Sequence, residues 1–184
     1  MGAKHSRHVQ PCPIDAYDET YSAAGVLFTD GTYCLAGYQP GKKNPCITGI
    51  GGMKEVGETA ILTALREAVE EIFNIKSVPP AFIKALQDKL RVRNCIKNST
   101  YIIFVYTFND LELVLKLAKQ YKIHSTLYTR LPRTLMELIF LRDVSQPSEI
   151  RHISLLPLVY HNPQVGPLVS RDFVVDMNML TLRK

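Results

Sequence analysis

The chain has 184 residues, of which 46% are apolar and 21% charged, as expected for one folded domain. Its apolar runs are far shorter than the roughly 20 residues that cross a bilayer, and no apolar signal segment follows the first basic residues. These observations argue against a membrane-spanning or secreted protein, and we expect a cytoplasmic one. Cys12, Cys34, Cys46 and Cys95 lack metal-binding spacing, so we expect free thiols.

The net charge of +5 combines two segments of opposite sign. Residues 52–75 hold five glutamates against two basic residues, whereas residues 84–133 hold ten Lys or Arg residues against three acids. An acidic cluster within a basic chain suits a cation site beside an anionic substrate. The alternative is a solvated surface on which charges cluster by accident.

In chain order, residues 1–20 contain two prolines and show no apolar periodicity, which predicts a flexible tail. The remainder, 21–184, is expected to form a single domain. Two short apolar runs, Ala23–Phe28 and Tyr33–Gly37, flank an Asp-Gly turn and predict a β-hairpin. Glycine and proline then predict loop structure over 39–52.

A short strand is expected within that loop region at Cys46–Ile50, and a helix at Thr59–Phe73. Pro80 suits the first turn of a second helix that ends near Leu90. Aromatic and β-branched residues predict a strand at Tyr101–Phe108.

The last third of the chain predicts one more helix and two more strands. Asn109 is the expected N-cap of a helix over Leu111–Lys122, with Glu112 as the acid of a capping box. Partial alternation predicts a strand over Met136–Val144, and a second strand is expected over Ile150–Leu156. Strands and helices mix without the rhythm of a parallel α/β protein, which favours an α+β fold.

The helix at Thr59–Phe73 separates its carboxylates from its apolar side chains. Glu67, Glu70 and Glu71 share an arc of about 100° on a helical wheel. A separate apolar stripe, expected to face the core, consists of Ile61, Leu62, Leu65, Ala68, Val69 and Ile72. Ala60 and Ala64 flank the carboxylates, and we expect their small side chains to leave room for a ligand.

Three carboxylates on one helical face repel one another unless a cation lies between them. Hard oxygen ligands of this kind suit Mg²⁺ or Mn²⁺. Taken alone, the same residues also fit an ordinary exposed acidic face on which Arg66 bridges to Glu70.

The wider spacing is a glycine, five residues, a glutamate, seven residues and then R-E-x-x-E-E, and it resembles the signature of the Nudix hydrolases. The six matching positions are Gly52, Glu58, Arg66, Glu67, Glu70 and Glu71. The resemblance extends from about Tyr21 to Pro157. It implies a Nudix-like α+β fold, in which a mixed, curved β-sheet is sandwiched between α-helices.

Three positions of the box depart from the family pattern. Ala68 and Asn74 stand where the pattern has aliphatic residues, and Phe73 stands where it has a glycine. Glycine adopts the left-handed conformation that ends a helix without steric penalty, whereas phenylalanine does not. Asparagine is the next most tolerant residue. We predict that Asn74 takes the left-handed conformation and that Phe73 continues the helix with its ring packed inward.

The resemblance implies a divalent-metal-dependent hydrolase that cleaves the pyrophosphate linkage of a nucleoside diphosphate linked to another moiety. Carried over by position, Glu67, Glu70 and Glu71 would ligate Mg²⁺ or Mn²⁺, and Arg66 would orient a carboxylate of the box. Gly52 and Glu58 would shape the loop, with Glu58 extending toward the metal.

The general base is less closely tied to the motif. Glu149 is the first candidate outside the box and Glu112 a weaker one, while the alternative for Glu149 is an ordinary surface residue.

The substrate remains open at this level. The basic region 84–133 would suit capped RNA, so an mRNA decapping hydrolase is one alternative, although no RNA-binding signature is present. The aromatic residues of Tyr101–Phe108 fit a core better than a base-stacking surface. A Nudix domain that binds a nucleotide without cleaving it is a further alternative. The sequence leaves the oligomeric state open.

The first six residues fit the pattern for N-myristoylation at Gly2, with Ser6 at the required position. One acyl chain binds membranes weakly, and Lys4 and Arg7 would help. The pattern therefore predicts weak peripheral membrane association, and the alternative is a chance match to a short motif.

Overall fold

The computed structural model describes residues 20–41, 44–158 and 168–181. Its strands are β1 (Ala23–Thr29), β2 (Tyr33–Gln39), β3 (Cys46–Thr48), β4 (Ile50–Met53), β5 (Asn94–Asn98), β6 (Tyr101–Thr107) and β7 (His152–Pro157). Its helices are α1 (Ala60–Phe73), α2 (Pro80–Lys89), α3 (Phe108–Gln120), α4 (Leu135–Phe140) and α5 (Arg171–Thr181). Each of these helices is too short or too polar to traverse a bilayer.

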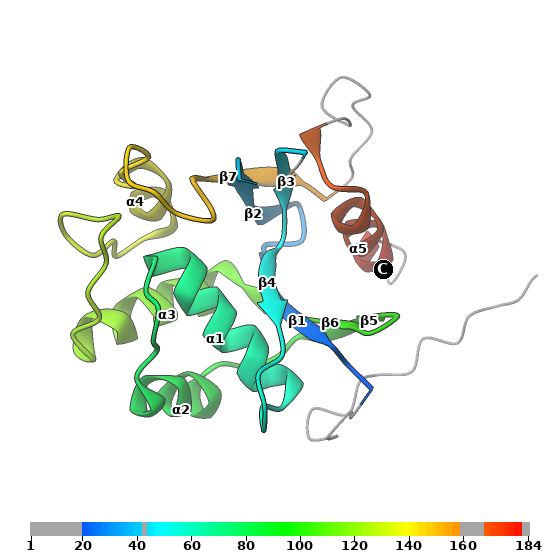
Figure 1. The fold of residues 1–184 in the computed structure, drawn as a ribbon, viewed down its shortest axis with the longest axis horizontal. Coiled ribbons are helices and arrows are strands. Elements are labelled where there is room, and N and C mark those ends of the chain that lie inside the picture. The colour runs from blue at the N-terminus through cyan, green and yellow to red at the C-terminus, as the bar shows by residue number, and fades with distance from the viewer. Residues whose placement is uncertain (1–19, 42–43, 159–167, 182–184) are drawn as a thin grey trace, which may run out of the picture.

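One mixed, seven-stranded sheet lies at the centre of the molecule (Figure 1). Its main path runs β3-β2-β1-β6-β5, while β4 pairs with β1 and β7 pairs with β2. β1 and β6 are parallel over their whole length, from Ala23 opposite Tyr101 to Thr29 opposite Thr107. The other pairings are antiparallel. The α+β class expected from the sequence is therefore confirmed.

Helices cover both faces of this sheet, which explains the uninterrupted apolar run of β6. Ile102, Phe104 and Tyr106 belong to the core that also contains the buried residues of α1 and α3. Ile103 and Val105 belong to a second core with the buried residues of α5. A strand buried on both faces needs apolar side chains at every position. The aromatic side chains of Phe104 and Tyr106 are thus core residues, as the sequence favours.

The predicted hairpin and the first two helices are confirmed. β1 and β2 form the hairpin, and the carboxylate of Asp30 accepts hydrogen bonds from the amides of Thr32 and Tyr33 in the turn. α1 begins after Thr59, whose side chain accepts from the amide of Leu62. α2 begins at Pro80 as predicted.

The predicted start of the third helix is wrong by three residues. α3 begins at Phe108, and its N-cap is Thr107 rather than Asn109. The Thr107 hydroxyl accepts from the amide of Asp110, and the Asp110 carboxylate accepts from the amide of Thr107. This reciprocal capping box satisfies two backbone donors and starts the helix at Phe108.

Two strand predictions need correction. The segment Met136–Val144 contains no strand, because Thr134 caps the short helix α4 by accepting from the amide of Glu137. The single strand expected at Cys46–Ile50 is two strands, β3 and β4, which pair with different partners, β2 and β1. The last predicted strand is shifted and spans His152–Pro157. β5 and α5 were not predicted.

The prediction for the end of α1 is confirmed. Asn74 has φ 53° and ψ 53°, the left-handed conformation, and its amide donates to the carbonyl of Glu70. The Phe73 ring is fully buried. The side-chain amide of Asn74 also donates to Thr126 Oγ1 at 3.0 Å and to the carbonyl of Pro147 at 3.1 Å.

Three of the four cysteines are described, and Cys34, Cys46 and Cys95 are free thiols as expected. Cys34 lies under α5, where its thiol contacts Met177 Sδ at 3.6 Å. Cys12, the proposed myristoylation site at Gly2 and the predicted tail up to residue 19 lie outside the described residues.

Candidate functional site

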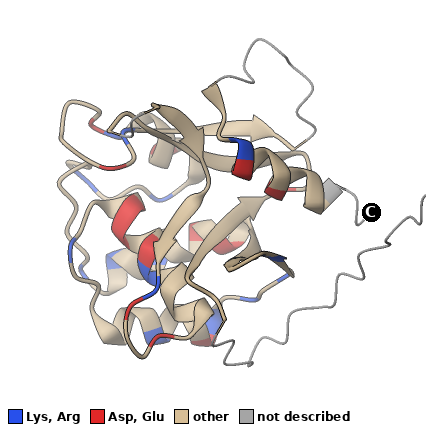
Figure 2. Cartoon of the chain, turned by 45° about the vertical axis from the view of Figure 1, so that its right-hand side comes forward, with Lys and Arg blue, Asp and Glu red and all other residues tan. Residues whose placement is uncertain are grey.

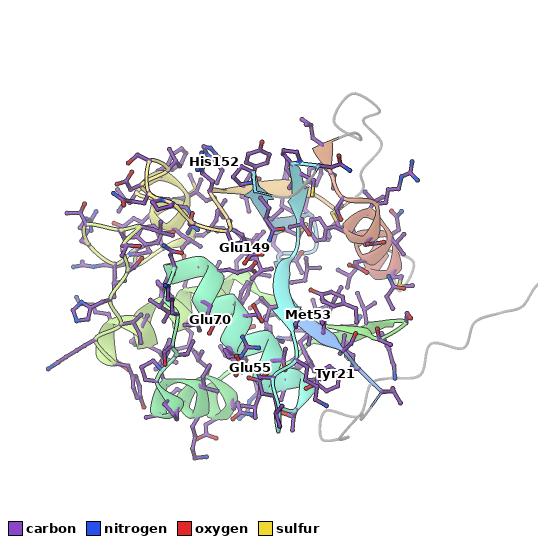
Figure 3. All side chains as sticks on the ribbon, viewed as in Figure 1. Tyr21, Met53, Glu55, Glu70, Glu149 and His152 are labelled. Atoms are coloured by element: carbon purple, nitrogen blue, oxygen red, sulfur yellow. The ribbon has the colours of Figure 1, made fainter. Side chains whose placement is uncertain are left out.

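The box carboxylates line a cavity of about 310 Å³ beside the C-terminal half of α1. Glu67, Glu70 and Glu71 come from the helix, and Glu149 comes from the segment before β7. Figure 2 shows the acidic positions gathered on α1. In Figure 3, Glu55, Glu70 and Glu149 lie along the helix from its N-terminal to its C-terminal end. The fold thus brings together the predicted metal ligands and the first candidate base.

One guanidinium holds two of these carboxylates. Arg66 Nη1 donates to Glu67 Oε1 at 2.9 Å and to Glu70 Oε2 at 2.8 Å. Its Nε donates to Glu58 Oε1 at 2.7 Å, and its Nη2 donates to the carbonyl of Met53 at 2.8 Å. The planar fork of arginine can serve several acceptors at once. The Arg66–Glu70 bridge of an ordinary acidic face is therefore present, but as one part of a larger network.

Glu58 is tied into the loop that precedes α1. Burial raises the pKa of its carboxyl, but hydrogen bonds from Arg66, Thr63 and the amide of Glu55 outweigh burial and lower the pKa overall. The side chain stays ionised and fixes Arg66 against the loop. It does not line the carboxylate cavity.

Two glycines of β4 lie against carboxylates of the box, Gly52 beside Glu67 and Gly51 beside Glu71. A Cβ atom on Gly52 would lie within 2.6 Å of the Glu67 carboxylate, so a side chain at this position would displace that carboxylate. The amide of Gly51 donates to Glu71 Oε2 at 2.8 Å. The Gly-rich strand therefore acts as a backbone cradle for two carboxylates.

The electrostatics of the cavity favour a cation. Burial raises the pKa of both Glu67 and Glu70, and Arg66 opposes this effect in each case. The neighbouring negative charges, including Glu149 near Glu67, raise these pKa values further. Hard oxygen donors that repel one another fit Mg²⁺ or Mn²⁺. In the described part of the chain no three acidic, His or Cys side chains form a finished metal cage; Arg66, Gly51 and Gln39 hold the carboxylates instead.

Gln39, at the end of β2, joins the box to Glu149. Its Nε2 donates to Glu71 Oε1 and to Glu149 Oε1, both at 3.2 Å, and the residue is only 2% exposed. Sequence reasoning missed this residue because a single glutamine after an apolar strand matches no motif.

Arg142, which lies just beyond α4, was also missed. Only 6% exposed, it donates to the carbonyls of Glu71 and Ile72 at 3.0 and 2.8 Å and to the carbonyl of Ile150 at 2.6 Å. A cation at a helix C-terminus satisfies carbonyls that have no partner within the helix. Arg142 thereby fixes the end of α1 relative to the segment that carries Glu149.

Two expectations about the surroundings of the box are wrong. Glu112, the weaker base candidate, lies outside the carboxylate cavity and accepts from the amide of Leu135. Ala60 and Ala64 leave no room for a ligand, because both are buried in the core beneath the helix. On the helical wheel Ala64 lies toward the apolar stripe, whereas Ala60 lies between Glu67 and Glu71, so the pattern alone does not show that Ala60 is buried.

The comparisons with known proteins bear on the fold. No protein-family model matches the sequence, and no curated protein matches it either. Among solved structures, the chain is similar to a bifunctional NMN adenylyltransferase/ADP-ribose pyrophosphatase from Francisella tularensis, described as complexed with AMP and a Mn ion. The identity is 12%, the TM-score is 0.51, and the match covers 89% of this chain and 42% of that one.

A second similar structure is the Nudix hydrolase RenU from M. smegmatis, with 15% identity and a TM-score of 0.45 over 89% of this chain and 86% of that one. The chain spans about two fifths of the length of the bifunctional protein. At these identities the likeness concerns the fold alone. The chain has the Nudix fold that its box motif predicts.

Proposed function

We propose that the chain is a divalent-metal-dependent hydrolase that cleaves the pyrophosphate linkage of a nucleoside diphosphate linked to another moiety. The observation that carries this proposal is the shared cavity of Glu67, Glu70, Glu71 and Glu149 on a Nudix fold. Three of these acids come from one helix and the fourth from a segment about 80 residues later, so chance clustering on one helical face does not account for them.

Glu67, Glu70 and Glu71 are the residues that would hold Mg²⁺ or Mn²⁺. Such a cation, when bound, neutralises charge on a pyrophosphate and lowers the pKa of a coordinated water. Arg66 orients Glu67 and Glu70 before any ligand arrives, because both carboxylates already accept its hydrogen bonds.

Glu149 is our candidate for the general base. It is exposed at the edge of the cavity, and Gln39 fixes one of its oxygens next to Glu71. A carboxylate in that position can accept a proton from an attacking water at Oε1 or Oε2. Gln39 and Arg142 act as positioning residues, since they contact the acids or their backbone.

The structure supports a small substrate better than capped RNA. All ten basic residues of 84–133 are described, and none of them lines the carboxylate cavity. Several are engaged elsewhere, as Lys84 is with Asp88 and Arg130 with Glu137. The alternative of a domain that binds a nucleotide without cleaving it is not favoured by the end of α1, because Asn74 takes the left-handed conformation in place of the missing glycine.

The proposal is tested by replacing one carboxylate at a time. Glu70→Gln and Glu71→Gln should each lower kcat by at least about 100-fold, the lower range for removing a catalytic group. Release of phosphate or nucleoside monophosphate is measured with Mg²⁺ and with Mn²⁺ on nucleotide sugars, dinucleoside polyphosphates, nucleoside triphosphates and capped RNA. EDTA should abolish turnover.

Asp88→Asn is the matched control, because Asp88 is exposed on α2, away from the carboxylate cavity, and pairs with Lys84. It should keep wild-type kcat. Near wild-type turnover in both glutamine variants, with the fold retained by circular dichroism, would show that the site is assigned wrongly. Capped RNA as the best substrate, with activity that falls steeply as salt is added, would establish decapping instead.

A further inference from the structure

A second cavity, of about 450 Å³, adjoins the carboxylate cavity across β4. Gly51 and Gln39 line this second cavity and also hydrogen-bond to carboxylates of the first one. The opposite wall comes from α5 and from the turn between β5 and β6. In Figure 1, β4 runs between α1 on one side and α5 on the other. Gly51 and Gln39 therefore connect the two cavities through their hydrogen bonds to Glu71.

The described lining of the second cavity is rich in hydrogen-bond acceptors and contains no cationic side chain. Asp172 and Asp176 line it from α5, and no Lys or Arg is among its described lining residues. Figure 2 shows acidic positions on α5 as well as on α1. Phosphate groups would be repelled here. A neutral or cationic group that carries N–H donors would be attracted.

A buried acceptor without a partner points to the same kind of ligand. Gln39 is 2% exposed, and its Oε1 has no hydrogen-bond partner among the described residues. Leaving such an atom unpaired is costly, and native proteins seldom do so without a functional reason. Its Nε2 is engaged by Glu71 and Glu149, which fixes the amide with the oxygen turned away from the box.

Asp176 is the acceptor best placed to select among ligands. It is 4% exposed, and Asn98 Nδ2 donates to its Oδ1 at 3.3 Å. A buried carboxylate that is oriented in this way needs N–H donors to replace the water that it has lost. Asp172 on the same helix is exposed and lies at the entrance.

The walls beside these acceptors suit a flat group. Phe173 and Tyr101 line the cavity, and Phe173 is almost fully buried. The Tyr101 hydroxyl lies over Gly25 and Gly51, where a Cβ atom on either glycine would collide with it. Aromatic rings on the wall of a cavity stack favourably against planar ligands.

We infer that the second cavity binds the nucleobase of the substrate, with Asp176 reading the N–H donors of an amino-bearing purine. This inference rests on the proposed hydrolase function, because it places the pyrophosphate over the box carboxylates and the base across β4. Guanine is the best match, since its N1–H and 2-amino group present two adjacent donors to one carboxylate.

Binding of nucleoside monophosphates tests the inference without any hydrolysis, because these compounds contain no pyrophosphate. At pH 8, calorimetry should show that GMP binds at least about 10-fold more tightly than IMP, which lacks only the 2-amino group. Asp176→Asn should abolish that difference, while Asp88→Asn should preserve it. Equal affinity for GMP and IMP in the wild type, or an unchanged preference in Asp176→Asn, would overturn the inference.

A second measurement requires no variant. Photolabelling of the wild type with 8-azido-GMP, followed by peptide mapping, should mark residues 98–101 or 170–176. A label confined to other segments would overturn the assignment of this cavity.

The two proposals can fail separately. If GMP preference depends on Asp176 but no diphosphate compound is cleaved, the cavity assignment stands and the hydrolase proposal falls. If hydrolysis occurs with the same base preference in wild type and Asp176→Asn, the hydrolase proposal stands and the cavity assignment falls. In the expected case, Asp176→Asn lowers kcat/KM for guanine substrates toward the value for hypoxanthine substrates.

Discussion

At the scale of single residues, the site depends on side chains that lie outside the recognised motif. Gln39 illustrates this, because one amide group contacts both Glu71 and Glu149 from a strand on the far side of the box. Without that amide, the two carboxylates would be free to separate under their mutual repulsion. The position of the proposed base therefore depends on a neutral residue.

Gln39→Leu should lower kcat by about 10- to 100-fold, the usual effect of losing a group that orients a ligand or a base. The concentration of Mg²⁺ or Mn²⁺ that gives half-maximal activity should rise as well. Gln120→Leu is the matched control, since Gln120 is exposed at the end of α3 and should keep full activity. Wild-type kcat and metal activation in Gln39→Leu would show that the amide has no positioning role.

The residues of the box could be predicted from sequence because they follow a regular spacing along one loop and one helix. Gln39 and Arg142 could not, since they reach the site through the folding of the sheet and act partly through backbone carbonyls. No local pattern encodes such contacts. Asp176 was hidden for the same reason, as it meets Asn98 only when α5 packs on the sheet.

At the scale of secondary-structure elements, the two ends of α1 are built differently. Its start uses a side-chain cap at Thr59, whereas its end uses the left-handed Asn74 with two further side-chain hydrogen bonds. These bonds connect the helix end to Thr126 and to the segment before Glu149. The exit of the helix thus helps to fix the edge of the site.

Asn74→Ala should lower the free energy of unfolding by about 1–2 kcal/mol, because alanine is strained in the left-handed region and cannot make the side-chain bonds. Asn74→Gly should cost less, since glycine removes the strain and loses only the bonds. Urea denaturation measures both, with Asn109→Ala on the exposed face of α3 as control. Equal losses in the two Asn74 variants would mean that backbone conformation is not the cause.

Two of the errors in predicting elements, at α3 and α4, share a physical origin in helix capping. Thr107 with Asp110 and Thr134 with Glu137 both place an acid three residues after a threonine, which is a start signal for a helix. These caps determine where each helix begins, whereas the apolar periodicity around them is ambiguous. A helix as short as α4 contains fewer than two turns, too few for a period of 3.6 to be recognised.

At the scale of the whole molecule, the sheet separates two chemically distinct cavities and two hydrophobic cores. The core under α5 is the smaller, and it includes Phe173 and Met177 from the helix itself. Asp176 is buried between these apolar residues and the turn at Asn98. An acid in this position affects the stability of the whole fold.

Burial raises the pKa of Asp176 to about 6 from its ordinary 3.8, and the charge of Asp172 adds to this effect while the hydrogen bond from Asn98 opposes it. The native state therefore holds this proton more tightly than the unfolded chain does. The contribution of Asp176 to stability is greatest below pH 3.8 and falls as the pH rises to about 6.

Asp176→Asn removes this titration. The difference in melting temperature, wild type minus Asp176→Asn, should decline between about pH 4 and pH 6 and then remain level. Differential scanning fluorimetry across this range measures the difference, and Asp88→Asn should show no such decline. A difference that stays constant with pH would contradict the burial of an ionisable group at this position.

The parallel pairing of β1 with β6 has a consequence for synthesis on the ribosome. Ser22 and Thr100, at the start of this pairing, are 78 residues apart in the chain. At about 5–20 residues per second, β6 is made about 4–16 seconds after β1, and β2, β4 and α1 are synthesised during that interval. Throughout that interval the apolar edge of β1 is open to other nascent chains, so slow translation of residues 54–107 should increase aggregation of the newly made protein.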